Sequence, residues 1–278
     1  MQTREQGTVM RSTDSEWGSS RDRGTIITGA ALIGVAGVAW VGVVLQGMSM
    51  KEGTGAYDLI SLSGGFAFLA AWVVMMAAMM LPSATPMIAL FDKVGRGSIQ
   101  GRDRAVGTAL FALVYLGIWV GFGLLVYLMS AALGALADAS PVVSAWLPYG
   151  LAAVLVAAGA YQFTALKQSC LGHCRTPLSF LMGRWQSGYA GALKLAGAHA
   201  AYCIGCCSAL MVVLVAAGAM SLPWVLLIAL IVFIEKLLPR GDFVARMVGV
   251  GFVVLGLAVA IDPELAATLR GTAMSSPM

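Results

Sequence analysis

The sequence predicts an all-α protein, built as a polytopic bundle of transmembrane helices. Of its 278 residues, 59% are hydrophobic and only 11% are charged, which lies far outside the composition of soluble globular domains. Apolar runs long enough to cross ~30 Å of hydrocarbon, about 20 residues each, recur along the chain. In addition, Lys and Arg are concentrated in alternate loops between these runs. We therefore expect the lipid bilayer to surround most of the chain.

Seven apolar runs predict seven membrane spans, with six as the alternative count. The run at 222–238 is short and contains Glu235, and the run at 106–135 is long enough to require tilt, so these two have the least defined ends. We expect a disordered cytoplasmic tail at 1–24, a transmembrane metal-binding domain at 25–262 and a short C-terminal tail at 263–278. The predicted spans are 25–46, 62–81, 106–135, 148–166, 197–219, 222–238 and 243–262.

The placement of basic residues predicts the orientation of the chain. Of the 17 Lys and Arg residues, all except Lys51 and Arg270 lie before the first span or around the links that follow the second, fourth and sixth spans. Because cytoplasmic loops are enriched in Lys and Arg, we expect a cytoplasmic N-terminus in a multi-pass protein of the cell membrane, in a bacterium the inner membrane. This explanation of the basic residues requires no nucleic-acid partner.

The second predicted span carries four methionines that can share one face of a helix. Two pairs spaced by four residues fall within a sector of roughly 140°, at 100° per residue. Pro82 and Pro86 follow them, and we expect the helix to bend or unwind there because proline removes a backbone donor. The alternative is that methionine simply fills irregular packing in the bundle. The four residues are Met75, Met76, Met79 and Met80.

All five cysteines lie near the end of the bundle that we expect to face the cytoplasm. Structural disulfides are disfavoured in a reducing compartment, so soft-metal binding or thiol redox chemistry are the functional options, and burial as small apolar residues is the alternative. In the run CLGHCR, Cys170, His173 and Cys174 have the spacing i, i+3, i+4 and can converge. Lys167 and Arg175 are expected to lower the pKa of these thiols.

The stretch HAAYCIGCC contains the second cluster of sulfur and imidazole ligands. On a helical wheel, His199, Cys203, Cys206 and Cys207 occupy a sector of about 100°. At 1.5 Å per residue they lie roughly 6–17 Å below the cytoplasmic surface, the same inner half as the methionines. Glu235 in IVFIEKLLP lies at a similar depth, where an ionisable group is costly unless paired, so we expect it to be a further ligand or to form a salt bridge with Lys or Arg.

Four motifs together resemble a known membrane family. The chain is similar to the family catalogued as domain of unknown function 2182, predicted metal-binding integral membrane proteins, and the resemblance covers about residues 25–262. It departs from the family's pattern at Gly172, where a bulkier or basic residue is expected. The resemblance implies a metal-handling membrane protein. The motifs are W-x-x-M-x-x-A-M-M-L-P-S at Trp72–Ser83, C-L-x-H-C-R at Cys170–Arg175, H-x-x-Y-C-x-G-C-C at His199–Cys207 and E-K-L-L-P at Glu235–Pro239.

The ligand set indicates copper as Cu(I), with zinc as the alternative, because thiolate and thioether sulfur select soft ions and zinc has little use for methionine. We expect an intramembrane copper site on the second and fifth spans, and a cytoplasmic station at Cys170, His173 and Cys174. It would serve transport, sensing or delivery, with a copper enzyme, a metallochaperone or other membrane subunits as partners. The sequence has no ATP-binding P-loop or phosphorylated-Asp motif, so we do not expect active pumping by this chain alone, and a metal-binding membrane protein or accessory subunit is favoured over an enzyme.

Two alternatives from other functional classes remain open. The first is a membrane thiol oxidoreductase, because Cys203 and Cys206 form a CxxC pair. The second is an accessory or structural subunit of a larger membrane metalloenzyme. Thiol titration after exposure to quinone tests the former, and stable co-purification with other membrane chains tests the latter.

Overall fold

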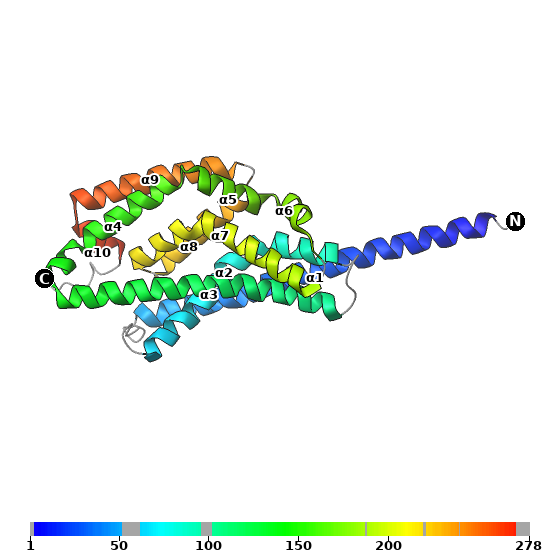
Figure 1. The fold of residues 1–278 in the computed structure, drawn as a ribbon, viewed down its shortest axis with the longest axis horizontal. Coiled ribbons are helices and arrows are strands. Elements are labelled where there is room, and N and C mark those ends of the chain that lie inside the picture. The colour runs from blue at the N-terminus through cyan, green and yellow to red at the C-terminus, as the bar shows by residue number, and fades with distance from the viewer. Residues whose placement is uncertain are drawn as a thin grey trace.

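The structure is a computed structural model that describes residues 3–51, 62–95, 102–186, 188–218, 221–238 and 240–270, and this part of the chain is helical without strands. The predicted fold class is therefore confirmed. Figure 1 shows the helices gathered into one bundle. They are α1 (Thr3–Lys51), α2 (Leu62–Gly95), α3 (Arg102–Ala139), α4 (Pro141–Tyr161), α5 (Ala165–Arg175), α6 (Pro177–Arg184), α7 (Gly188–Gly218), α8 (Leu222–Leu237), α9 (Gly241–Ile261) and α10 (Glu264–Leu269).

Within the described residues, six helices are long and apolar enough to cross a membrane: α1 over Gly24–Met48, and α2, α3, α4, α7 and α9. The remaining predicted span, 222–238, forms α8, which has 16 residues and rises only about 24 Å. Six, the lower of the two predicted numbers of membrane spans, therefore equals the number of described helices that are long enough to cross a membrane. Helix α8 still returns the chain to the end of the bundle that holds α5, because its Glu235 contacts Lys167 of α5.

The division of the chain into tails and a membrane domain stays a prediction, as does the cytoplasmic N-terminus. Helix α1 includes residues 3–23, for which the sequence predicts a disordered tail, and the structure describes side chains of this helix only from residue 24. Residues 271–278 of the predicted C-terminal tail lie outside the described residues.

Helix α2 continues through both of its prolines, so of the two outcomes expected at Pro82 and Pro86, a bend or unwinding, unwinding was wrong. The helix runs on to Gly95. Two hydroxyl side chains on the same turns donate to backbone carbonyls: Ser83 Oγ to Met80 O at 2.9 Å and Thr85 Oγ1 to Leu81 O at 2.8 Å. These bonds add to the hydrogen bonding of the neighbouring turns, and membrane helices tolerate proline where neighbouring helices and side chains support the segment.

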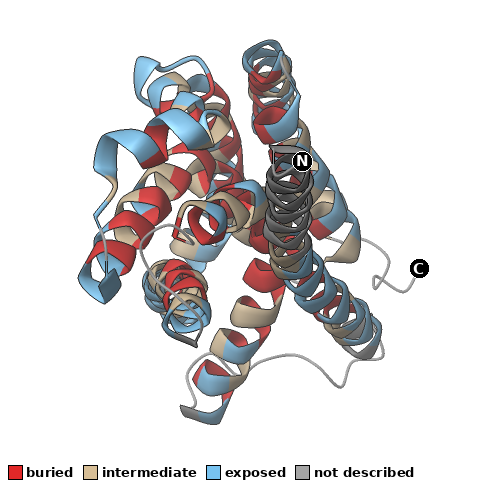
Figure 2. Ribbon diagram, turned by 90° about the vertical axis from the view of Figure 1, so that its right-hand side faces the viewer, coloured by how far each residue is buried: buried red, intermediate tan, exposed pale blue. Residues whose placement is uncertain are grey.

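Helix α7 lies inside the bundle and contacts α3, α4, α5 and α8. Beside it, α4 and α9 pack closely (Figure 1). A Cβ atom at Gly159 would lie only 2.6 Å from the carbonyl oxygen of Gly249, so only a residue without a side chain fits there without movement of the helices. Small residues permit such close approach between membrane helices. Figure 2 shows the buried segments of the helices facing one another and the exposed ones on the outer side. Side chains of α7 are thereby shielded from the surroundings of the protein.

Candidate metal centre

Three thiols of α7 form a compact buried cluster. The sulfur atoms of Cys203, Cys206 and Cys207 all lie within 4.8 Å of one another, and their exposed fractions are 0%, 1% and 1%. The sulfurs of Cys206 and Cys207 are 3.3 Å apart, and Cys206 Sγ also donates to the carbonyl oxygen of Cys203 at 3.2 Å. The spacing of these residues along one helix face brings the thiols together, as the sequence predicts.

Helix α5 adds a fourth thiol from outside α7. Cys174 Sγ lies 3.8 Å from Cys206 Sγ, and the Cys174 side chain is half-buried. Cys170, one turn earlier, packs against α7 at Gly205, where an added Cβ would lie 2.5 Å from its sulfur. Glycine at 205 leaves room for the Cys170 side chain and so allows α5 to approach this closely. Sulfur from two separate elements of the sequence thus meets in one place.

A buried lysine faces the cluster. Lys236, near the C-terminal end of α8, places Nζ 3.0 Å from Cys203 Sγ and 3.2 Å from Ser83 Oγ of α2. Its side chain is only 7% exposed. A buried ammonium is costly unless a negative or polar group compensates it, so Lys236 and a Cys203 thiolate stabilise each other. The amine joins α2, α7 and α8 at the site.

Aromatic rings enclose the side of the cluster formed by α3. The hydroxyl of Tyr115 lies 3.0 Å from Cys203 Sγ, and the Tyr115 ring stacks on His199 with centroids 5.6 Å apart. His199 is buried among rings that include Phe111 and Phe180, and its Nδ1 has no hydrogen-bond partner within the described residues. Tyr115 lies between His199 and the thiol of Cys203. The compact group of possible metal ligands consists of the three sulfurs and includes neither ring nitrogen of His199.

Glu235 forms a buried ion pair with the other lysine of this region. Its Oε2 lies 2.7 Å from Lys167 Nζ, and both side chains are 1% exposed. The salt bridge that the sequence offered as an alternative is therefore present. The pair ties α5 to α8, which holds Cys174 and Lys236 beside the thiols of α7.

The four methionines of α2 are all buried, as the shared helix face predicts. They precede Ser83, whose hydroxyl accepts a hydrogen bond from Lys236. The methionines and the three thiols of α7 belong to the same buried core cluster, and Ser83 with Lys236 adds a hydrogen-bonded connection between α2 and Cys203. The exposed fractions are 2% for Met75, 1% for Met76, 4% for Met79 and 0% for Met80.

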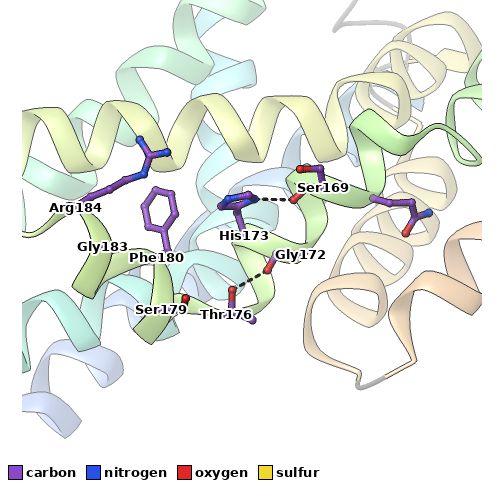
Figure 3. Close-up of a pocket in the computed structure, with 9 residues that line it drawn as sticks. Ser169, Gly172, His173, Thr176, Ser179, Phe180, Gly183 and Arg184 are labelled. Carbon is purple, nitrogen blue, oxygen red and sulfur yellow. Dashed lines mark hydrogen bonds between the residues drawn. The ribbon is translucent and has the colours of Figure 1, made fainter.

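His173 lines a pocket between α5 and α6 and stacks on Tyr202 of α7, with ring centroids 4.3 Å apart. The pocket measures about 470 Å³. Figure 3 shows His173, Phe180 and Arg184 around it. Cys170, His173 and Cys174 therefore all contact α7, and of these three residues His173 also lines the pocket.

The expected lowering of thiol pKa by Lys167 and Arg175 was wrong. Lys167 pairs with Glu235, and Arg175 Nη1 lies 2.9 Å from an oxygen of Asp242. Burial raises the pKa of the Cys170 thiol. Both cations form ion pairs with carboxylates of α8 and α9. The carboxylates compensate the positive charge, which therefore has little effect on the pKa of the thiols.

Sequence reasoning missed Lys236 and Tyr115 as parts of the site. The charge pattern of the sequence places Lys236 only among the basic residues of a cytoplasmic link, although it follows Glu235 in the EKLLP motif. A Lys inside the last turn of an apolar run is the signal that could have indicated a buried role. Tyr115 lies in a long apolar run whose sequence gives no indication of the residue it faces.

Comparison with known protein families shows which family the sequence of this chain matches. A family model described as PpoB2, copper chaperone, matches residues 69–259, a range that contains all the thiols, the methionines and Lys236. A comparison with curated proteins and another with solved structures gave no match. The finding supports the copper-related family expected from the sequence, and does not confirm the name domain of unknown function 2182. The chain belongs to the PpoB2 family of copper chaperones.

Proposed function

We propose that this protein is a membrane-embedded copper chaperone, which holds Cu(I) on buried cysteine thiolates and passes it to a copper enzyme or another copper protein. The observation that supports this best is the meeting of four thiols: Cys203, Cys206 and Cys207 on α7 within 4.8 Å of one another, and Cys174 of α5 at 3.8 Å from Cys206. The six apolar helices of membrane-spanning length support the bilayer as its location.

The sulfur geometry suits a single soft ion. Thiolate–metal bonds are about 2.3 Å long for zinc, so two sulfurs on one ion of that size lie at most about 4.6 Å apart. The separations of 3.3 Å and 3.8 Å are within this limit. Cu(I) favours thiolate over harder ligands. Two or three of the four thiols would bind the ion at one time.

The charge of Lys236 suits Cu(I) on two thiolates. Such a unit carries a net charge of −1, which the ammonium of Lys236 neutralises in a site shielded from water. We assign Lys236 the role of holding the copper–thiolate unit, because it contacts Cys203 directly.

The experiment is copper binding by the full chain in detergent under anaerobic, reducing conditions. Copper stoichiometry is measured by mass spectrometry, and affinity by competition with bicinchoninate. We expect one tightly bound Cu(I) in the unaltered protein, and a loss of affinity of about 10-fold or more in Cys206→Ser and in Cys174→Ser.

The matched control is Ala201→Ser, which adds the same hydroxyl to an exposed position of α7. It should bind copper normally. Unchanged copper stoichiometry and affinity in both cysteine variants would overturn the proposed site. X-ray absorption at the copper edge gives an independent measure, with two or three sulfur neighbours expected.

A second candidate function, thiol oxidoreductase, draws on the 3.8 Å separation of Cys174 and Cys206. A disulfide requires the two sulfurs to close to about 2.05 Å, a movement that α5 could supply. Under this alternative the pair would be oxidised by a quinone and reduced again by dithiothreitol in cycles. Copper chaperoning predicts no such turnover, and loaded copper should protect both thiols from alkylation.

A further inference from the structure

We propose that the pocket between α5 and α6 is the docking site of a small anionic thiol complex of Cu(I), and that His173 receives the copper there and passes it to Cys174. This inference rests on the proposed function and adds the route by which copper reaches or leaves the buried thiols. It assigns a role to His173, which the thiol cluster does not use.

The pocket has the size and lining of a small-molecule site. Its volume of about 470 Å³ lies in the usual range for such sites, about 300–1,000 Å³. Polar groups of α5 and α6 surround one aromatic ring. The lining residues are Gln168, Ser169, Gly172, His173, Thr176, Ser179, Phe180, Gly183 and Arg184.

Arg184 gives the pocket its affinity for an anion. Its guanidinium lies over the rings of Phe180 and Tyr202, at 5.3 Å and 5.5 Å from their centroids, and donates to the Tyr202 hydroxyl at 2.9 Å. These contacts hold the side chain in place, and the remaining N–H groups of the fork can bind a carboxylate. Because small biological thiols carry carboxylates, a thiol complex of Cu(I) fits both the charge and the volume.

His173 is prepared as a metal ligand by the hydrogen bond on its other nitrogen. Its Nδ1 lies 2.8 Å from the carbonyl oxygen of Ser169 (Figure 3), and a carbonyl only accepts, so Nδ1 carries the proton. The lone pair is then on Nε2. Metal-binding histidines characteristically donate their other N–H to a backbone carbonyl in this way. The ring also stacks on Tyr202, with centroids 4.3 Å apart and planes at 12°, which fixes its orientation.

The pocket adjoins the thiol cluster through α5 itself. Cys174 directly follows His173 in the chain, is half-buried, and lies 3.8 Å from Cys206 Sγ. Phe180 separates the pocket from the second imidazole: its ring centroid is 6.2 Å from that of His173 and 6.0 Å from that of His199. Copper bound at the pocket therefore has a short path along α5, while the Phe180 ring closes the direct path to His199.

The transfer is a ligand exchange without redox chemistry. The bond between copper and the donor thiolate breaks as bonds to His173 Nε2 and then to Cys174 Sγ form, and copper remains Cu(I) throughout. The proton of the incoming Cys174 thiol passes to the departing donor thiolate, which leaves as a neutral thiol. No oxidant or reductant is needed.

Two glycines of the pocket allow it to be filled without disturbing the helices. A Cβ at Gly172 or at Gly183 would meet nothing within 4 Å, and both residues line the pocket. Gly172→Leu and Gly183→Leu therefore place a side chain in the pocket volume. Gly251 of α9 is exposed and equally open, so Gly251→Leu is the matched control. His173→Ala removes the imidazole alone.

The experiment measures loading of the full chain in detergent from two probes, Cu(I)–glutathione and Cu(I)–acetonitrile, by the ultraviolet absorption of the copper–thiolate bonds. We expect Gly172→Leu and Gly183→Leu to slow loading from glutathione about 10-fold, with less effect on acetonitrile. His173→Ala should slow both. Equilibrium affinity for Cu(I), measured against bicinchoninate, should be unchanged in the two leucine variants, as should both rates in Gly251→Leu.

Loading at the unaltered rate in all three pocket variants would overturn the pocket proposal and leave the thiol cluster standing. Equal slowing of both probes by the leucine variants would overturn glutathione-like recognition. Absence of copper uptake by the unaltered chain from either probe would instead overturn the proposed function, and the pocket proposal with it.

Discussion

Lys236 Nζ of α8 lies 3.0 Å from Cys203 Sγ of α7, and both side chains are buried. The ammonium and the thiol have no access to bulk water that could solvate a charge on either. A positive charge at this point favours the thiolate that binds copper, and a bound copper–thiolate unit in turn favours the ammonium. The pair connects the cluster to α2 as well, because Lys236 also donates to Ser83.

Replacing Lys236 by Leu should weaken Cu(I) binding by about 10- to 100-fold, the usual effect of removing a group that supports metal ligands. Leucine removes the charge and, unlike methionine, adds no sulfur that could bind copper. Lys236→Arg should retain most of the affinity. Competition with bicinchoninate measures the effect, and Lys194→Leu, at an exposed lysine of α7, is the control. Equal affinity in Lys236→Leu and the unaltered protein would show that the charge plays no part.

Breaking the Lys167–Glu235 pair should destabilise the protein without removing the copper site. Lys167→Met leaves a carboxylate buried without its partner and should cost about 3–5 kcal/mol in free energy of unfolding. In the double variant Lys167→Met, Glu235→Met, no charge is left unpaired, so most of the loss should be recovered. Denaturation in detergent monitored by circular dichroism gives the free energies.

Copper binding by that double variant decides between the two roles that the sequence leaves open for Glu235. We expect the copper stoichiometry to be the same as in the unaltered protein, because Glu235 pairs with Lys167. Loss of copper from a folded double variant would identify Glu235 as a ligand instead.

Changing Met75, Met76, Met79 and Met80 together to Leu should leave the affinity for Cu(I) nearly unchanged. Leu and Met have similar volumes, and each exchange costs less than about 1.5 kcal/mol of stability. We expect this because the four thiols already supply the two or three sulfur ligands of the proposed site. Bicinchoninate competition gives the affinity, and a large loss would bring the methionines back into the ligand set.

Alkylation of Cys170 should require a higher pH than alkylation of an ordinary thiol. Burial raises the pKa of Cys170, so its reactive thiolate appears only as the pH passes above the usual range, near 8.5 for a free cysteine. Labelling with N-ethylmaleimide across a pH series, read residue by residue by mass spectrometry, measures this shift. A midpoint below that of glutathione in the same series would contradict it.

The sequence indicated the fold class and the chemistry because both depend on patterns within single segments. Apolar runs of membrane-spanning length predicted the helices, and the spacing of Cys203, Cys206 and Cys207 predicted a shared face. The same reasoning predicted that α2 bends or unwinds at Pro82, and the helix continues without unwinding, because proline is tolerated in a membrane helix where neighbouring helices and side chains support the segment.

Only the tertiary structure decided which groups meet across helices. It brought Cys174 to the α7 thiols and His173 to a separate pocket, it paired Glu235 with Lys167, and it placed Lys236 beside Cys203. Helical periodicity determines which side chains share a face, since it depends on neighbours in the chain. The rotation and approach of two helices depend on packing over their whole length, as at Gly205 against Cys170, and no local pattern contains that information.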